Sequence, residues 1–237
     1  MRCHRKDSLV IPLANVTLRG DLAVPHDAKG LVVFANGSGG RHSSRHLFVA
    51  ERLQRGHLAT LLTDLLTEEE DQVRANRFDV DLLARRLVEV TRWAQQHLLM
   101  ARLPIGYFGA GTGAAAALWA AAELGSEVRA VVSRGGRPDL AMDVLNLVSS
   151  PALLIVGGHD FDVLDLNRRA YERLTAVKSL EVIPGATHLF EEAGALPKVA
   201  DLAAAWFLRH LPQAHELAGV ALAAPGEEEG SREIWWD

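Results

Sequence analysis

Asp160 and His188 have the side-chain types of an acid–base pair, and each stands just after an apolar run of the sequence. Continuous apolar runs of this kind predict parallel strands that are buried on both faces. The carboxyl ends of parallel strands meet at one edge of a sheet, so we expect the two side chains to lie together. A carboxylate that orients an imidazole makes a general base, able to take a proton from a hydroxyl group or from water. Asp162 is the alternative acid.

Residues 104–118 read as a short strand, a tight turn and a helix. The apolar run 105–108 is followed by Gly109-Ala-Gly-Thr-Gly113 and then by an alanine-rich, helix-favouring segment. This is the context of a nucleophile elbow, whose pattern is G-x-S-x-G, except that Gly111 stands at its centre. Glycine tolerates the strained backbone of such a turn better than serine, by about 1 kcal/mol, but has no attacking atom. The sequence therefore predicts an elbow without its nucleophile.

The chain order of elbow, acid and histidine assigns a role to each group. His188 is predicted to be the general base directed at Gly111, and Asp160 to orient its imidazole. The backbone N–H groups of Ser38 and Thr112 are predicted to form an oxyanion hole. The hydroxyl of Thr112 is expected to point away from the histidine. Such an arrangement is suited to acyl transfer.

The same glycines allow a second interpretation. Gly109-x-Gly111-x-x-Ala114 fits the dinucleotide fingerprint G-x-G-x-x-G/A. Ser133 and Arg134 follow about twenty residues later, where an NADP-binding protein holds the 2′-phosphate. The glycine turn, however, follows four predicted strands instead of the first, and a dinucleotide site leaves the acid–histidine pair unexplained.

Alternating apolar runs and amphipathic segments predict an α/β fold with an eight-stranded, mostly parallel sheet and helices on both faces. The first two strands are expected to form an antiparallel edge hairpin, and no inserted lid domain is expected. Thr67 and Glu70 have capping-box spacing, which predicts a short helical turn. The predicted strands are 9–13, 16–24, 31–35, 58–63, 105–108, 128–133, 151–156 and 180–183. The predicted helices are 44–55, 79–98, 114–124, 139–148, 163–174 and 196–210.

Four motifs occur in order along the chain: Phe34-Ala-Asn-Gly-Ser-Gly-Gly, the elbow, Val156-Gly-Gly-His-Asp160 and Gly185-Ala-Thr-His188-Leu-Phe190. With them the chain resembles the α/β-hydrolase superfamily, and within it the small, lidless dienelactone hydrolase-like proteins, over residues 9–211. The resemblance implies the α/β-hydrolase fold and hydrolysis of an ester, lactone or thioester. The family has Ser or Cys where Gly111 stands, and usually His where Asn36 stands.

Substrate-pocket residues are expected at the same strand ends, and three of them are apolar, which favours a partly apolar acyl substrate. Ser133 is expected to form hydrogen bonds in the pocket, with a role as substitute nucleophile as the minor alternative. Arg134 and Arg137 suit either a substrate carboxylate or acidic groups of the surface. The predicted pocket residues are Asn36, Leu65, Leu66, Ser133, Arg134 and Phe161.

His42 and His46 stand four residues apart, a spacing that suits a metal ion, but no acidic third ligand is close in sequence. We therefore expect no metal and no cofactor. With Arg41 and Arg45, these histidines are expected to form a solvated or anion-facing surface. The acidic run 68–70 is expected to be a solvated helix face.

Composition limits the classes of partner. The chain has 237 residues, of which 49% are hydrophobic, enough for one domain with a buried core. The net charge of −5 does not indicate a protein that binds nucleic acid, since such proteins ordinarily carry a basic surface. One cysteine, Cys3, excludes an internal disulfide framework, and no signal-like or membrane-spanning run is present, so a cytoplasmic protein is expected.

We expect a single α/β-hydrolase domain over 1–212 and a tail over 213–237, mobile or docked, that ends in Ile234-Trp-Trp-Asp237. The sequence does not determine the oligomeric state.

Two functional hypotheses lead. The first is a hydrolase-type scaffold for acyl transfer on a small-molecule substrate, inactive or nearly so because the nucleophile was lost naturally or replaced by design. The second is a natural non-hydrolytic enzyme or a ligand-binding protein on the same fold, with the His188–Asp160 pair as a base. Binding of NADP is a third, minor hypothesis.

Overall fold

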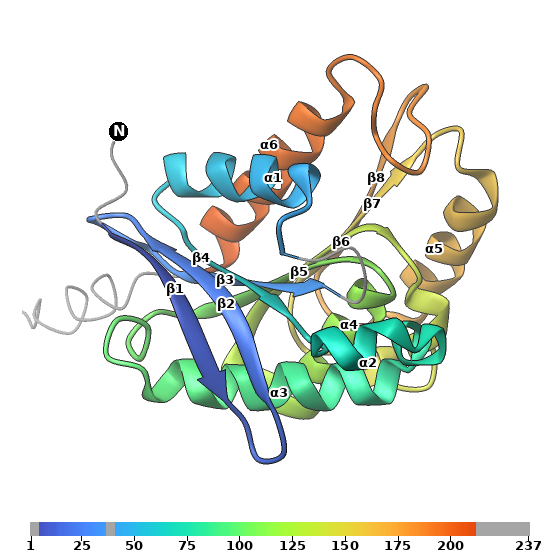
Figure 1. Ribbon diagram of the computed structural model, residues 1–237. Helices are drawn as coiled ribbons and strands as arrows, with labels where there is room; N and C mark the ends of the chain where they lie inside the picture. Colours follow the sequence, from blue (N-terminus) through green and yellow to red (C-terminus); the bar gives the residue numbers. More distant parts are fainter. Residues whose placement is uncertain (1–4, 37–40, 212–237) are drawn as a thin grey trace, which may run out of the picture.

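The computed structural model describes residues 5–36 and 41–211, with side chains from residue 7 onward. An eight-stranded sheet runs through the molecule in the order β1-β2-β4-β3-β5-β6-β7-β8 (Figure 1). The β1–β2 and β2–β4 pairs are antiparallel, and all the other neighbouring pairs are parallel. The predicted fold class is confirmed, and the described residues contain no inserted lid domain. The strands are β1 (Arg5–Pro12), β2 (Thr17–Val24), β3 (Leu31–Asn36), β4 (Ala59–Asp64), β5 (Ile105–Gly111), β6 (Val128–Gly136), β7 (Ala152–Gly157) and β8 (Lys178–Ile183).

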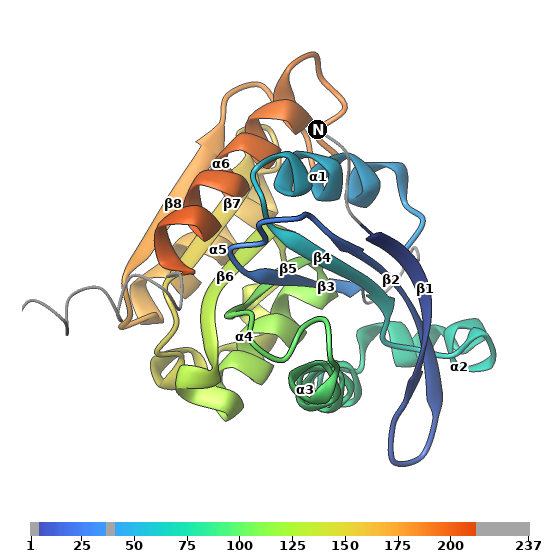
Figure 2. The ribbon, with the colours of Figure 1, turned by 90° about the vertical axis from the view of Figure 1, so that its left-hand side faces the viewer.

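Helices cover both faces of this sheet, as its buried parallel strands require. One face is covered by α1 and α6, and the other by α3, α4 and α5 (Figure 2). The helices are α1 (Ser44–Arg55), α2 (Glu68–Gln72), α3 (Val80–Gln96), α4 (Thr112–Leu124), α5 (Phe161–Arg173) and α6 (Ala195–His210).

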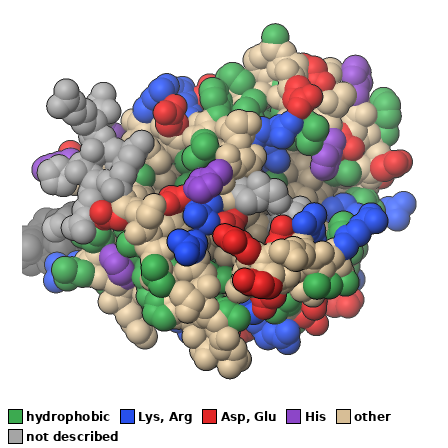
Figure 3. All heavy atoms as spheres, in the orientation of Figure 1, with side chains coloured by type: hydrophobic (Ala, Val, Ile, Leu, Met, Phe, Trp, Pro, Cys, Tyr) green, Lys and Arg blue, Asp and Glu red, His purple; other side chains and the backbone are tan. Residues whose placement is uncertain are grey.

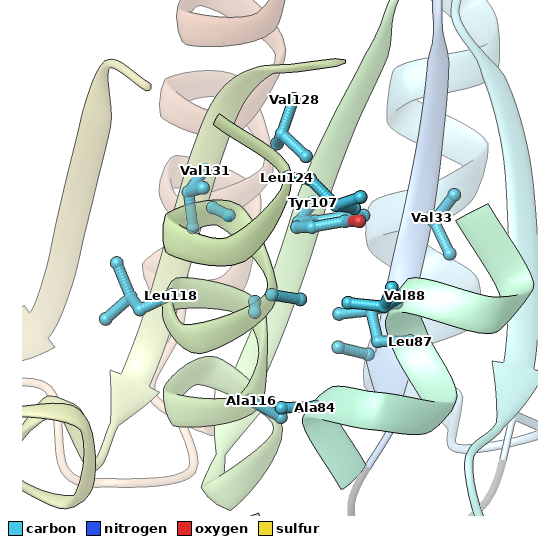
Figure 4. Close-up of a cluster of buried hydrophobic side chains, with 14 of the residues drawn as sticks. Val33, Ala84, Leu87, Val88, Tyr107, Ala116, Leu118, Leu124, Val128 and Val131 are labelled. Carbon is cyan, nitrogen blue, oxygen red and sulfur yellow. The ribbon is translucent and has the colours of Figure 1, made fainter. Parts of the chain in front are cut away.

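The larger of the two buried clusters lies between the sheet, α3 and α4 (Figure 4). Tyr107 of β5 is fully buried there, and its hydroxyl lies 2.5 Å from Oγ1 of Thr91. Burial raises the pKa of Tyr107, so the hydroxyl stays protonated. Ala84 of α3 and Ala116 of α4 point toward one another, and small side chains at a contact let two helices approach closely. Helix α4, which begins at the elbow, is therefore packed closely against α3.

The capping box predicted at Thr67 and Glu70 is present at the start of α2. The N–H of Glu70 donates to Oγ1 of Thr67 at 3.2 Å, and the N–H of Thr67 donates to Oε2 of Glu70 at 3.0 Å. Glu70 also accepts hydrogen bonds from Nη1 and Nη2 of Arg86, at 3.1 and 2.7 Å. The expectation of a solvated acidic face is therefore wrong for Glu70, because its carboxylate neutralises a guanidinium whose side chain is 9% exposed.

The helix predicted for residues 139–148 is absent. Two 3-10 turns take its place, η3 (Pro138–Ala141) and η4 (Leu145–Leu147). The N–H groups of Leu140 and Val144 bond to carbonyl groups three residues back. Apolar residues three and four apart suit either helix type, so the spacing alone did not distinguish them.

The glycine turn follows β5, and the sheet opens with an antiparallel hairpin. A dinucleotide-binding fold has its glycine turn after the first strand of a parallel sheet, so that interpretation of the glycines is wrong. Cys3, Ser38 and the tail 213–237 lie outside the described residues, so the predictions made for them stay predictions. None of the described helices is long and apolar enough to cross a membrane.

Candidate active site

Gly111 occupies the sharp corner between β5 and α4. Its φ of 55° and ψ of −128° lie in a region that favours glycine, as the elbow interpretation requires. An ideal Cβ built on Gly111 meets no atom of the described residues within 4 Å. At Gly109, by contrast, such a Cβ would lie 2.6 Å from Cα of Ala114 and from the carbonyl oxygen of Gly113. Gly109 is thus needed for the close approach of strand and helix, whereas position 111 projects into open space.

Asp160 and His188 are in contact, at the ends of β7 and β8. Nδ1 of His188 lies 2.7 Å from Oδ2 of Asp160. Asp160 precedes α5 but makes no capping hydrogen bond to that helix, so its carboxylate serves the histidine instead. The aspartate side chain is 14% exposed and the histidine side chain 50%, which leaves the imidazole accessible. With Nδ1 donating to the carboxylate, Nε2 is the proton acceptor. Asp162, the alternative acid, is exposed.

The imidazole lies over β6, the strand next to the elbow. Gly135 has a φ of 50°, and an ideal Cβ there would lie 3.5 Å from both Nδ1 and Cε1 of His188. Gly136 pairs with Gly111 in the ladder. The carbonyl oxygen of Gly136 accepts a hydrogen bond from Nδ2 of the buried Asn167 at 3.0 Å. Sequence reasoning missed these two glycines and Asn167, although Gly-Gly at the end of a predicted strand was a signal for close backbone approach.

Thr112 begins α4, and the first N–H groups of a helix have no acceptor within it. Its hydroxyl donates to the carbonyl oxygen of Arg77 at 3.0 Å, so the side chain is occupied and the backbone N–H is the available donor. Asn36, at the end of β3, is buried and donates from Nδ2 to the carbonyl oxygen of Thr63 at 3.0 Å. Ser38, the other predicted oxyanion donor, lies outside the described residues. Of the two predicted oxyanion donors, the structure therefore describes one, the backbone N–H of Thr112.

Two predicted pocket residues are misplaced. Ser133 is fully buried beneath the elbow, and an ideal Cβ on Gly136 would lie 2.1 Å from its Oγ. Its hydroxyl is sealed from solvent, so the structure does not support its roles as pocket residue or as substitute nucleophile. Leu65 is fully buried in the large core cluster and forms no open wall. Both errors arise because a strand-end position does not tell which face its side chain takes.

The other predicted walls differ in exposure. Phe161, in the first turn of α5, is 68% exposed, and its ring centroid lies 6.1 Å from that of His159. Leu66 is nearly buried beside a small pocket that Arg41 and Asp64 also line. Phe161 thus presents an exposed aromatic ring next to the strand end that carries Asp160.

Arg134 is buried at the end of β6, with 9% of its surface exposed. Its Nε and Nη1 have no hydrogen-bond partner, and its guanidinium carbon lies 5.8 Å from the ring centroid of Phe190. Burial, with the nearby charge of Arg45, lowers the pKa of Arg134 to about 10. Arg137 instead meets a surface acid, Asp139, at 2.7 Å.

The residues expected to form a solvated surface near α1 are mostly paired with acidic side chains or backbone carbonyl groups. Arg41 bonds to Oδ2 of Asp64 at 2.7 Å and, with His42, to the carboxylate of Asp21. Nε of Arg45 donates to the carbonyl oxygen of Leu189 at 3.1 Å, and its Nη2 pairs with Glu191. His46 is buried, with its ring centroid 6.0 Å from that of Phe34. The two histidines thus lie in different environments, and within the described ranges no group of three potential metal ligands occurs.

Comparisons with known proteins place this geometry in a family. No family model matches the sequence. A dienelactone hydrolase from Anabaena variabilis, known from a crystal structure, is 49% identical, with a TM-score of 0.86 over 89% of this chain and 100% of that one. The chain belongs to the dienelactone hydrolase family. Est1E from Butyrivibrio proteoclasticus, at 15% identity and a TM-score of 0.73 over 86% of this chain and 98% of that one, shares the fold alone.

This member of the dienelactone hydrolase family also has a longer relative. A protein of Mycobacterium tuberculosis with the name "Putative phosphoribosyl transferase" is 55% identical over 208 residues. The match covers 87% of this chain but 47% of that protein. The chain therefore spans about half the length of this relative.

Proposed function

We propose that the chain is an acyl-transfer scaffold of the ester, lactone or thioester hydrolase type, whose nucleophile position is occupied by Gly111. The observation that carries the proposal is the open space at an elbow-shaped Gly111, combined with the His188–Asp160 hydrogen bond. The proposed substrate is a small acyl molecule.

The chemistry follows from the groups present. Nε2 of His188 accepts a proton from the attacking hydroxyl group, and Asp160 stabilises the imidazolium that forms. The N–H of Thr112 donates to the developing oxyanion. The proton then passes from the imidazolium to the leaving alcohol. In the chain as it stands, water is the attacking group, and a residual rate roughly 10³–10⁴-fold above the uncatalysed one is expected from well-studied triads.

The test is a gain of function at position 111. Hydrolysis of short-chain aryl esters and of a simple lactone is measured for the native chain, Gly111→Ser and Gly111→Ala. The serine variant is expected to be faster by orders of magnitude. The alanine variant carries the same backbone strain without a hydroxyl and is the matched control. Adding His188→Ala to the serine variant is expected to erase the gain.

Equal rates in all these variants would contradict the proposal. That outcome favours the alternative in which the same fold serves as a ligand-binding protein or as a non-hydrolytic enzyme with His188 as base. The transferase name of the mycobacterial relative belongs to a protein about twice as long. We propose that it does not describe the reaction of this chain, because acyl transfer uses both the elbow and the His188–Asp160 pair.

A further inference from the structure

Glu192 closes a small loop around the residue proposed as the base. Its Oε1 accepts two hydrogen bonds from Thr187, at 3.1 Å from the backbone N–H and at 2.7 Å from the hydroxyl. Both bonds join residues five positions apart, and His188 is the first residue inside the loop that they close. The contact therefore restrains the main chain directly before the imidazole.

His188 lies in a tight turn within this loop. The N–H of Phe190 donates to the carbonyl oxygen of Thr187 at 3.2 Å, which places His188 and Leu189 at the centre of a four-residue turn. Phe190 has a φ of 55°, unusual for a bulky side chain, and is 1% exposed. A strained residue of this kind persists only where the surrounding contacts fix it. The geometry of the turn thus depends on what holds it from outside.

Two neighbouring elements hold the turn on either side of the base. From α1, Nε of Arg45 donates to the carbonyl oxygen of Leu189 at 3.1 Å. From the end of β7, the N–H of His159 donates to the carbonyl oxygen of Ala186 at 2.9 Å. These bonds fix the chain after the base and two residues before it. The N–H and the side chain of the residue between them are held by Glu192.

The carboxyl group of Glu192 is ionised in this contact. The hydrogen bond from the hydroxyl of Thr187 is the main cause that holds the pKa of Glu192 below its usual value of 4.5. Hydrogen bonds to a carboxylate are stronger than those between neutral groups. The other oxygen, Oε2, is buried and has no hydrogen-bond partner in the part of the chain that the structure describes. The two bonds from Thr187 therefore offset the cost of burying this group.

We propose that Glu192 is a positioning residue for His188, which sets the direction of the imidazole by holding the main chain at Thr187. Asp160 orients the ring through Nδ1, and Glu192 fixes the backbone from which the ring projects. Two acids thus act on one histidine by different routes. The inference rests on the proposed function for the role of His188 as base, but the orientation of the imidazole is measurable without catalysis.

The first test observes the imidazole of the chain with Gly111 in place. The ring ¹⁵N shifts of neutral His188, assigned by their loss in His188→Gln, give the ratio of its two tautomers. The tautomer with the proton on Nδ1, which donates to Asp160, is expected to predominate. Glu192→Gln is expected to lower this ratio by about threefold or more, because the ring no longer meets the carboxylate squarely.

Thr187 tests the same contact from its other partner. Thr187→Val removes the hydroxyl and is expected to lower the tautomer ratio, whereas Thr187→Ser keeps the hydroxyl and is expected to retain the native ratio. Thr175→Val, which removes an exposed hydroxyl bonded at 3.3 Å to a backbone carbonyl elsewhere, is the matched control. A thermal melt checks that each variant is folded, and the valine variant decides if Glu192→Gln unfolds. A native ratio in both Glu192→Gln and Thr187→Val overturns the proposal, as does a native chain without an excess of the Nδ1–H tautomer.

A second measurement separates this inference from the hydrolase proposal. In the Gly111→Ser background, Glu192→Gln is expected to lower kcat for an aryl ester about tenfold or more. KM is expected to stay within about twofold, because the substrate contacts remain. If Gly111→Ser is inactive while the tautomer ratio of His188 depends on Glu192, the hydrolase proposal fails and the positioning role stands. Hydrolysis by Gly111→Ser that does not depend on Glu192 gives the reverse result.

Discussion

The imidazole of His188 rests on the backbone of Gly135, with Nδ1 only 3.5 Å from the place where a Cβ of that residue would stand. Gly135 has a φ of 50°, a conformation that favours glycine, although a Cβ there would be in ordinary van der Waals contact with the imidazole. The contact fixes one side of the imidazole, and the hydrogen bond to Asp160 fixes its edge. Together they hold the base over β6, beside the elbow.

Gly135→Ala is expected to shift the backbone on which His188 rests, because alanine does not tolerate this φ, and so to lower the kcat of the Gly111→Ser variant by at least tenfold. It should also cost about 1 kcal/mol of stability, because alanine is strained at a positive φ. The matched control is Gly125→Ala. Gly125 has a φ of 55° but open space around its Cβ position, far along α4 from the site. If both variants lose the same stability but only Gly135→Ala loses activity, the contact between Gly135 and His188 is supported. Equal activity in the two variants contradicts it.

The two glycines of the elbow are expected to differ in their tolerance of a side chain. Gly111→Ala should cost about 1 kcal/mol in the free energy of unfolding, from backbone strain alone. Gly109→Ala should cost more, about 1–3 kcal/mol or above, because its Cβ meets the backbone of α4 at 2.6 Å. Denaturant unfolding of both variants measures the difference. A larger loss at position 111 than at 109 would show that the corner is not open.

The contact between Glu70 and Arg86 is expected to make stability depend on pH. Hydrogen bonds from Arg86 hold the pKa of Glu70 below its usual value of 4.5. The pair therefore contributes stability above the unfolded pKa, and this contribution is lost as the pH falls through the lower folded pKa. Glu70→Gln should cost about 1–3 kcal/mol at pH 7, and the difference from the native chain should shrink in acid.

Glu68→Gln is the control for that measurement, because Glu68 is exposed on the same short helix. It should leave stability nearly unchanged at every pH. Urea unfolding of the three proteins between pH 3 and pH 7 checks the expectation. A constant difference between Glu70→Gln and the native chain over this range would mean that the carboxylate is not the group responsible.

Much of the fold and part of the candidate site follow from local sequence patterns. Asp160 and His188 each follow a buried strand, and parallel strands bring such positions to one edge, so their contact was predictable. The capping box at Thr67 was predictable because it depends on two residues three apart. The conformation of Gly111 followed from the glycines on either side of it.

What was missed depends on contacts between distant segments. Ser133 and Arg134 are adjacent at the end of one strand, but they take opposite faces: one is sealed under α4 and the other lies against Phe190. The pairing of Glu70 with Arg86 joins α2 to α3, and no pattern within either helix indicates it. A period in the sequence gives the spacing of buried positions, but not the partner that each side chain meets.

The hydrogen bond from Arg45 to the carbonyl oxygen of Leu189 joins residues that are 144 positions apart. The strand and helix of the elbow, by contrast, are neighbours in sequence and are able to form early. Contacts between distant parts of a chain are slow to form, because a large loop must close first. During synthesis the loop that carries His188 emerges after the elbow, β6 and Asp160 have already been made. We therefore expect the proton acceptor to be among the last groups to reach its place as the protein folds.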